Sequence, residues 1–191
     1  MTFCYEYERP SLTVDIIVLS LINNFLNVLL IQRKNEPYKN KWALPGGFVN
    51  SKENIRHAAI RELKEETNIN VDINNLYEFK VFGDYGRDPR GWTVTISYIC
   101  FVKNNINFKA KSDAKNISFF DVKNLPELAF DHNKIIDEAI YNLEKILFTS
   151  NILENVLNIN DLNELKKVYE IILSKKYELS DFVTLKSFLT K

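Results

Sequence analysis

Short apolar runs rich in β-branched residues recur along the chain and are separated by polar, turn-forming segments. Leu12–Ile22 and Asn27–Arg33 are two such runs, and the turn-prone pair Asn23-Asn24 joins them. Leu76–Phe82 and Trp92–Lys103 form a second pair, joined by a segment that is dense in both turn residues and charges. The pattern predicts four β-strands arranged in two pairs.

The second half of the chain adds one strand and one amphipathic helix. Ile117–Val122 is a short apolar run that predicts a further strand. Asp131–Phe148 predicts a helix, because its aliphatic residues fall on one broad face: Ile135, Ile136, Ala139, Ile140, Leu143, Ile146 and Leu147. Strands therefore stand before and after a charged helical segment at 61–69, and a second helix follows. We expect an α/β fold, an α/β/α sandwich in which a mixed sheet lies between helices.

Composition narrows the class of protein. The 191 residues include 25 Lys plus Arg and 25 Asp plus Glu, so no global field attracts nucleic acid or a membrane. Hydrophobic residues make up 46%, which is enough for a real core, but the longest apolar run, Ile16–Ile22, is too short to span a bilayer. Cys4 and Cys100 show no metal-binding spacing and are interpreted as reduced thiols. Without a signal peptide, we expect a cytoplasmic protein.

The segment 47–69 carries the chemistry of the chain. Positions three and four apart share a helix face, so Glu62, Glu65 and Glu66 bring three carboxylates together, and these repel one another without a counter-charge. A divalent cation removes that repulsion, and oxygen ligands favour magnesium or manganese, which take their remaining ligands from water and phosphates. A solvated acidic helix is the simpler interpretation, but it does not explain the Leu-Pro-Gly-Gly segment at 44–47 or Arg61.

This spacing resembles the Nudix box: Gly47, five residues, Glu53, seven residues, and then the segment Arg-Glu-Leu-Lys-Glu-Glu-Thr-Asn-Ile at 61–69. One position departs from the family pattern, because Asn68 stands where the family has glycine. That residue follows the helix end and often takes a left-handed conformation, for which asparagine is the next best residue. The resemblance implies the Nudix sandwich fold, which we expect to survive the substitution.

The resemblance also implies a set of metal ligands. Carried over residue by residue, the ligands of Mg²⁺ (or Mn²⁺) are Glu62 and Glu66, with Glu65 and the backbone carbonyl of Gly46 as further candidates.

Catalytic roles follow from the same resemblance. Glu65 is the candidate general base, and Glu127, in the Pro126-Glu127 loop, is the alternative. Arg61 and Glu53 are expected to pair and to hold the box loop against the helix, a role that is structural more than catalytic.

Three segments outside the box point to one group within the family. Residues 9–15, 87–91 and 129–132 resemble those of bacterial ADP-ribose pyrophosphatases and of the Nudix-related regulators of NAD metabolism. In that group the ligand is ADP-ribose, and an arginine-rich loop lies near its phosphates and ribose. The resemblance therefore implies that Arg87 and Arg90 bind substrate, a task that suits the planar guanidinium fork.

Several of these residues admit simpler interpretations. Arg87 and Arg90 also fit a solvated loop in which they pair with Asp84 and Asp88. His132 is a general base, a neighbour of the phosphates or a residue that orders the turn, and the last is favoured. Trp42 either stacks on adenine or belongs to the core, where aromatic residues more often lie.

The tail predicts a second, smaller unit. We expect a Nudix domain at 1–148 and, at 149–191, a helical module that resembles an incomplete winged helix. Asp161–Leu173 is similar to its first helix and Ser180–Leu189 to its recognition helix, but the chain ends at Lys191, where a wing hairpin would follow. The second helix offers Lys186 as its one base, whereas a DNA reader needs several Lys or Arg for phosphates. The module is expected to pack on the Nudix domain or on a second subunit.

The intact box and the incomplete DNA-reading unit together favour an enzyme. The prediction is a magnesium-dependent pyrophosphohydrolase that cleaves ADP-ribose to AMP and ribose 5-phosphate and, by analogy with the group, forms a homodimer. The alternative is an ADP-ribose-responsive transcriptional regulator, for which DNA is the further partner. A third hypothesis, hydrolysis of oxidised nucleoside triphosphates, is weakened by the Arg-Asp-Pro-Arg-Gly segment at 87–91.

Overall fold

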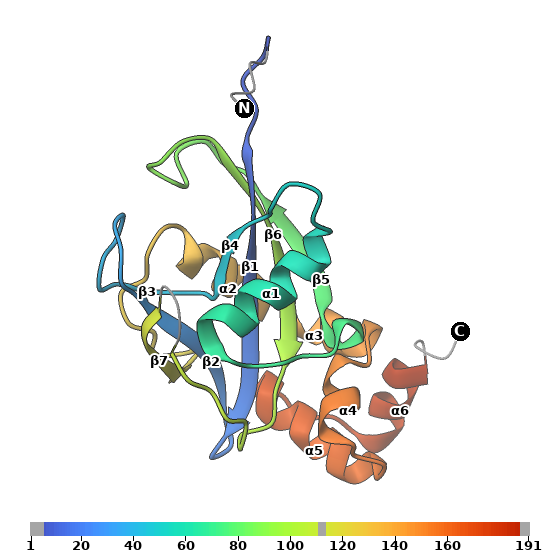
Figure 1. Ribbon diagram of the computed structural model, residues 1–191. Coiled ribbons are helices and arrows are strands. Elements are labelled where there is room, and N and C mark those ends of the chain that lie inside the picture. The colour runs from blue at the N-terminus through green and yellow to red at the C-terminus, as the bar shows by residue number, and fades with distance from the viewer. Residues whose placement is uncertain (1–5, 111–113, 188–191) are drawn as a thin grey trace.

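The fold is a mixed β-sheet between helices, and the computed structural model describes residues 6–110 and 114–187 (Figure 1). The described strands are β1 Ser11–Ile22, β2 Phe25–Arg33, β3 Trp42–Ala43, β4 Gly46–Phe48, β5 Tyr77–Phe82, β6 Thr93–Phe101 and β7 Ala114–Asp121. They form one sheet whose main order is β3-β2-β1-β6-β5, with β4 paired to β1 and β7 to β2. Because β1 and β6 are parallel and the remaining pairs are antiparallel, the sheet is mixed. The predicted fold class is confirmed.

Helices cover both faces of the sheet. They are α1 Ile55–Thr67, α2 His132–Tyr141, α3 Leu143–Thr149, α4 Ile152–Leu157, α5 Leu162–Leu173 and α6 Leu179–Ser187, with a 3₁₀ turn η1 at Ile73–Asn75. Helix α1 crosses one face, and the C-terminal helices gather at one end of the other (Figure 1). Among the described residues, no helix is long and apolar enough to cross a membrane.

Strand β1 contributes side chains to two apolar clusters, one on each face of the sheet. Its central residues are buried on both faces, as a strand covered from both sides requires. Ile16 and Val18 pack into a cluster with Ala59 and Leu63 of α1. Ile17 and Leu19, one residue out of phase, pack instead with α2, α3 and the C-terminal helices.

Asparagines mark two boundaries in the chain. Asn23 and Asn24 both take positive φ, 51° and 64°, as the tight turn between β1 and β2 requires. The single helix predicted over Asp131–Phe148 was wrong, because the structure breaks it at Asn142 into α2 and α3. The Asn142 side chain donates at 2.8 Å to the Glu138 carbonyl, the same oxygen that accepts the Asn142 backbone amide at 3.1 Å.

The sequence pattern missed four short elements: β3, β4, α4 and the 3₁₀ turn η1. Strands β3 and β4 are two and three residues long, and β4 contains Gly46 and Gly47, which have little strand propensity. Their pairing with β2 and β1 comes from tertiary contacts. Helix α4 was not predicted either, since its six residues are too few to show a period.

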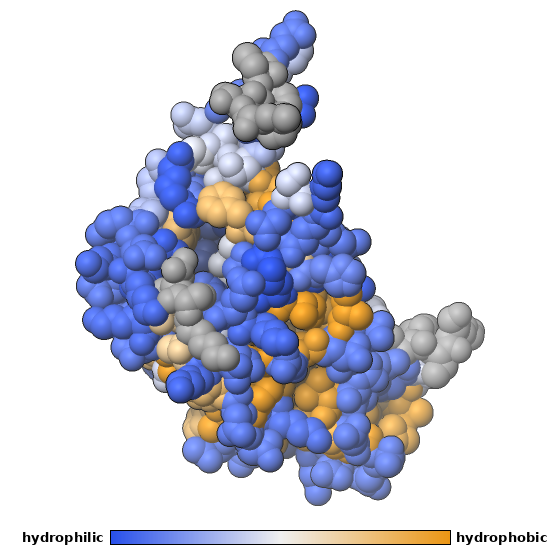
Figure 2. Space-filling model, in the orientation of Figure 1, coloured by the Kyte–Doolittle hydropathy of each residue, from blue (hydrophilic) through white to orange (hydrophobic). Residues whose placement is uncertain are grey.

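The C-terminal helices pack against the sheet of the same chain, which is the first of the two predicted alternatives, packing on the Nudix domain or on a second subunit. Helix α5 begins after Asp161, whose side chain caps the Glu164 amide at 2.8 Å. Phe182 of α6 is fully buried beside Tyr169, and both belong to the same apolar cluster as Ile17 of β1. Apolar side chains remain visible over α3–α6 in the space-filling view (Figure 2). Phe188 and Leu189, the end of the predicted second helix, lie outside the described residues, as does Cys4.

Candidate functional site

One cavity of about 500 Å³ brings the sequence-predicted residues together. Strand β1, the turn after β2, the loop 44–50, helix α1, the loop 83–92 and the start of α2 all reach its wall. The predicted residues among its lining are Gly46, Glu62, Glu65, Glu66, Arg87 and Arg90. Segments that are far apart in the sequence thus meet at the box helix, where the sequence predicts a metal and phosphate site.

Helix α1 is capped at both ends by asparagine. Asn54 precedes it, and its side chain accepts the Arg56 amide at 3.0 Å. Asn68 follows it with φ 63° and ψ 11°, and its amide donates to the Lys64 carbonyl at 2.9 Å. Asn68 therefore takes the left-handed conformation expected of the box glycine, and the helix ends where the box requires.

Arg61 ties the box loop to the helix. Its guanidinium binds Glu53 through Nε at 2.7 Å and Nη2 at 2.9 Å, and Nη2 also donates to the Phe48 carbonyl at 3.0 Å. The Arg61 hydrogen bond is the largest cause that lowers the pKa of Glu53 to about 2. The expected pair is present, and its geometry is that of a structural clamp.

The Gly46-Gly47 segment lies directly against the box glutamates. The Gly46 amide donates to Glu66 Oε2 at 2.9 Å. A Cβ on Gly47 would lie 2.5 Å from the Glu62 carboxylate, so any other residue there would require that side chain to move. At Gly46 a Cβ would lie 2.2 Å from the Val14 carbonyl oxygen, which belongs to the backbone, so close approach requires glycine at that position.

The donor set on this wall fits a divalent cation. Glu62, Glu65 and Glu66 offer carboxylate oxygens and Gly46 a carbonyl, which are the ligands that magnesium prefers. Within the described ranges, no three acidic side chains already converge on one point, because Glu62 turns to Arg61 at 2.7 Å and Glu66 to the Gly46 amide. Burial raises the pKa of Glu62, and the neighbouring Arg61 only partly opposes that rise.

Cationic and aromatic groups form the opposite wall. Arg90, whose side chain is 41% exposed, binds Asp88 through Nε at 3.0 Å and Nη2 at 2.7 Å. Burial tends to raise the pKa of Asp88, but the hydrogen bonds from Arg90 outweigh it and lower that pKa. The Arg90 guanidinium also lies 5.0 Å from the ring centre of Phe48 and 5.4 Å from that of Phe130, so its place is fixed.

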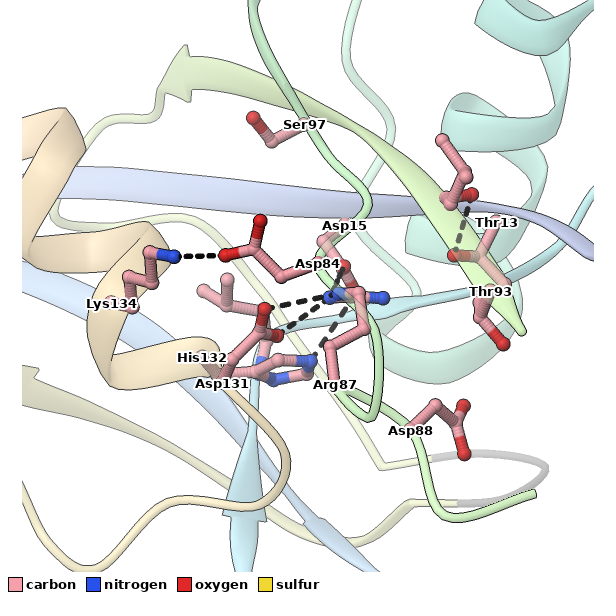
Figure 3. A network of polar contacts seen from close by, with 12 residues as sticks. Thr13, Asp15, Asp84, Arg87, Asp88, Thr93, Ser97, Asp131, His132 and Lys134 are labelled. Atoms are coloured by element: carbon pink, nitrogen blue, oxygen red, sulfur yellow. Dashed lines mark hydrogen bonds and ion pairs between the residues drawn. The ribbon is translucent and has the colours of Figure 1, made fainter. Parts of the chain in front are cut away.

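Arg87 has a different environment from Arg90. Its side chain is only 5% exposed and donates to Asp131 at 2.7 and 3.0 Å and to Asp15 at 3.4 Å. His132 lies beside them, with Nε2 3.5 Å from Asp15 Oδ1 (Figure 3). Its Nδ1 accepts the Leu44 amide at 2.8 Å, and burial lowers its pKa. The favoured interpretation had His132 order the turn at the start of its own helix, but the side chain instead binds the distant Leu44 amide, so it connects two segments of the chain.

Other candidates lie elsewhere. Glu127 is exposed, pairs with Lys41 and does not line the cavity. Trp42 packs edge-on to Phe120 at 4.7 Å in the core, and Asp84 pairs with Lys134 in place of an arginine. Cys100 is a buried free thiol, and burial raises its pKa to about 12.

Sequence reasoning assigned no role to several wall residues, among them Phe48 and also Asp15 and Phe130, which lie in two of the segments that pointed to the ADP-ribose group. Asp15 could have been found from the sequence, because it is a charged residue in an otherwise apolar, buried strand, and a buried charge needs a partner. The two phenylalanines gave no such signal.

Comparisons with known proteins agree with this geometry. A model of the NUDIX domain family matches residues 11–140. A protein of Methanocaldococcus jannaschii named ADP-ribose pyrophosphatase is 43% identical over 132 residues, or 69% of this chain and 74% of that protein. The ADPR responsive transcriptional repressor NtrR of Acinetobacter baylyi is 36% identical over 187 residues, or 93% of this chain and 72% of the repressor.

A solved structure matches nearly the whole fold. The crystal structure of a MutT/nudix family protein from Enterococcus faecalis superposes with a TM-score of 0.84 and 33% identity, covering 98% of this chain and 84% of that one. The box, the sandwich fold and the family match agree, and the chain belongs to the Nudix hydrolase family.

Proposed function

We propose that this Nudix hydrolase cleaves ADP-ribose to AMP and ribose 5-phosphate with the help of Mg²⁺. The observation that carries the proposal is the two-sided cavity: Glu62, Glu65 and Glu66 on one wall and Arg90 on the other. A divalent cation neutralises the charge of a pyrophosphate, and a guanidinium suits its oxygens because it binds phosphate through two parallel hydrogen bonds. The similarity to the M. jannaschii ADP-ribose pyrophosphatase supports the choice of substrate.

Glu62 and Glu66, with Glu65 and the Gly46 carbonyl, are the residues that would hold the metal ion. When bound, Mg²⁺ or Mn²⁺ supplies neutralisation of the pyrophosphate charge and a lower pKa for a bound water. The clamp between Arg61 and Glu53 keeps the loop and the helix in register, so that these oxygens face the same space.

The chain's own side chains account for the remaining chemistry. Glu65 lies in the cavity with a half-exposed carboxylate and is the group that takes a proton from the attacking water. The water oxygen bonds to one phosphorus, and the bond from that phosphorus to the bridging oxygen breaks. Attack on either phosphorus gives AMP and ribose 5-phosphate, with one water consumed. Glu127, exposed and outside the cavity, is the less suitable base.

The two arginines of the loop 83–92 have different roles. Arg90 faces the cavity and is the substrate contact that the geometry supports. Arg87 also reaches the cavity wall, but its guanidinium is buried against two aspartates. We therefore assign direct phosphate contact to Arg90 and support of the loop to Arg87.

Release of AMP from ADP-ribose in the presence of Mg²⁺ tests the proposal. Glu66→Gln should abolish most turnover, since it removes a charged ligand yet keeps an oxygen that accepts the Gly46 amide. Glu164→Gln, the same change on the exposed face of α5, is the matched control and should leave the rate unchanged. Turnover of nucleoside triphosphates in preference to ADP-ribose would refute the assigned substrate.

A second candidate function is an ADP-ribose-responsive regulator, favoured by the similarity to NtrR over 93% of this chain. Against it, the Lys186 side chain on α6 is only 13% exposed and binds Glu154, so it does not face outward to DNA. A promoter fragment that shifts in a salt-dependent manner and is released by ADP-ribose would support the regulator.

We also propose that the chain forms a homodimer in the cytoplasm. Within one chain, we place the boundary between the Nudix domain and the C-terminal helical module after residue 148. The resemblance of residues 9–15, 87–91 and 129–132 to the Nudix-related regulators of NAD metabolism supports a role in that metabolism. Light scattering on the purified protein measures the assembly, and a mass of one chain would refute the dimer.

A further inference from the structure

We propose that His132 is a positioning residue: its neutral imidazole holds the Leu44–Gly47 segment against the box glutamates, and the buried cluster of Asp15, Arg87 and Asp131 fixes that imidazole. The proposed function is needed only for the kinetic part of the test. The structural part concerns contacts that exist whatever the substrate is.

The hydrogen bond to Leu44 defines the state of the ring. The Leu44 amide donates to His132 Nδ1 at 2.8 Å, and the contact is buried. An amide N–H donates only to a nitrogen that carries a lone pair, so Nδ1 is unprotonated and the ring proton sits on Nε2. Nε2 lies 3.5 Å from Asp15 Oδ1, so that proton faces a carboxylate (Figure 3). Both nitrogens thus have partners in the protein, and His132 is not available as a base for substrate.

Leu44 begins the segment that shapes the metal-holding wall. The Pro45 carbonyl accepts the Ile16 amide at 2.8 Å, and Gly46 pairs with Asp15 in the sheet. The Gly46 amide then binds Glu66 at 2.9 Å, and Gly47 leaves the space in which the Glu62 carboxylate lies. His132 therefore acts two residues away from the backbone that faces these glutamates.

Arg87 completes the cluster from the other side. Its guanidinium binds Asp131, the residue before His132, and also Asp15, which faces the imidazole. With side chains 5% and 9% exposed, Arg87 and Asp15 are shielded from water, so each depends on the other for charge compensation. Since Arg87 belongs to the loop that carries Arg90, the cluster joins the substrate-facing loop to the Leu44–Gly47 segment.

Three variants separate positioning from general stability. His132→Leu removes the acceptor at similar volume, whereas His132→Asn places a side-chain oxygen near the position of Nδ1, where it accepts the Leu44 amide. His57→Leu is the matched control, because this second histidine is exposed on α1.

Amide hydrogen exchange measured by NMR tests the contact itself. In His132→Leu we expect the Leu44 amide to exchange at least about tenfold faster, while amides in the central strand β6 keep the wild-type rate. His132→Asn should restore protection at Leu44, and His57→Leu should leave it unchanged. Unchanged exchange of Leu44 in His132→Leu would overturn the proposal. Equal acceleration in β6 would also overturn it, because that result describes general destabilisation.

Kinetics and metal binding test the consequence. Loss of a residue that orients metal ligands costs roughly 10- to 100-fold in activity or metal affinity. For His132→Leu we expect kcat for ADP-ribose to fall and Mn²⁺ affinity, measured by electron paramagnetic resonance, to weaken by such factors. KM for ADP-ribose should change less than about threefold, since Arg90 is untouched, and His132→Asn should recover most of the loss.

The two proposals fail in different ways. If the wild-type protein releases no AMP from ADP-ribose, the proposed function fails, whereas Leu44 exchange and Mn²⁺ affinity still decide the role of His132. If Leu44 exchange rises in His132→Leu but Mn²⁺ affinity stays at the wild-type value, His132 holds the segment without positioning the ligands, and the inference is wrong.

Discussion

Truncation of Phe182 tests whether the C-terminal helices belong to the same cooperative core as the sheet. The side chain is fully buried on α6. Its ring lies 5.1 Å from that of Tyr169, 5.7 Å from that of Phe148 and 6.1 Å from that of Tyr177. The cluster that contains these rings continues into strand β1. Phe182→Ala therefore removes the centre of the contact between α6 and the remainder of the tail.

The magnitude follows from burial. Truncating a fully buried phenylalanine to alanine costs about 3 to 5 kcal/mol of unfolding free energy. For a chain of this size each kcal/mol corresponds to about 2 to 4 °C, so Tm should fall by about 6 to 20 °C. Urea denaturation followed by circular dichroism measures the loss, and one transition with an unchanged slope is expected from a shared core.

Val183→Ala is the matched control for this experiment. Val183 is the next residue on α6 and is 42% exposed, so its truncation should change stability by less than about 0.5 kcal/mol. A cost below about 1 kcal/mol for Phe182→Ala would refute the packing argument. An early transition for the tail alone, at a denaturant concentration that leaves the sheet intact, would refute the shared core.

Three further predictions concern the site. Asn68→Ala should cost about 1 to 2 kcal/mol in urea denaturation because Asn68 is left-handed, whereas Asn68→Gly should not destabilise the chain. Glu65→Gln should lower kcat for ADP-ribose by about 10²- to 10⁴-fold, whereas Glu127→Gln should retain it; the reverse order would make Glu127 the base. Burial lowers the folded-state pKa of His132, so unfolded chains take up the proton first as pH falls below about 6.5. Stability should therefore be full above that pH and decrease below it, and the urea midpoint of His132→Asn should show a weaker pH dependence.

The box could be interpreted from sequence because its constraints are local. Carboxylates at 62, 65 and 66 share a face in any α-helix, and the pairing of Arg61 with Glu53 needs only the helix and the loop before it. Asn68 was predictable for the same reason, since a helix end makes the same demand in any fold.

The second wall could not be predicted in the same way. Asp84 and Asp88 stand nearest to Arg87 in sequence, but the structure pairs Arg87 with Asp15 and Asp131. That choice depends on the parallel pairing of β1 with β6, which aligns Ser11 with Thr93 and so brings the loop before β6 to the beginning of β1, from where Arg87 reaches Asp15. A pattern of residue types does not show which distant segments lie side by side. The spacing of the box residues along one helix, in contrast, shows by itself which of them share a face.

The orientation of Lys186 relates the tail to function. Its ammonium group binds Glu154, donates to the Tyr169 hydroxyl at 2.8 Å and lies 5.1 Å from the Tyr169 ring centre. Reaching a DNA phosphate would require breaking these contacts and leaving Glu154 half-buried without its cation, which is strongly unfavourable. On the outer side, α6 presents Asp181 to solvent, and a carboxylate repels phosphate. Helix α6 therefore uses Lys186, the one base among its described residues, to hold the helices together, which is the arrangement expected of a structural module attached to a hydrolase.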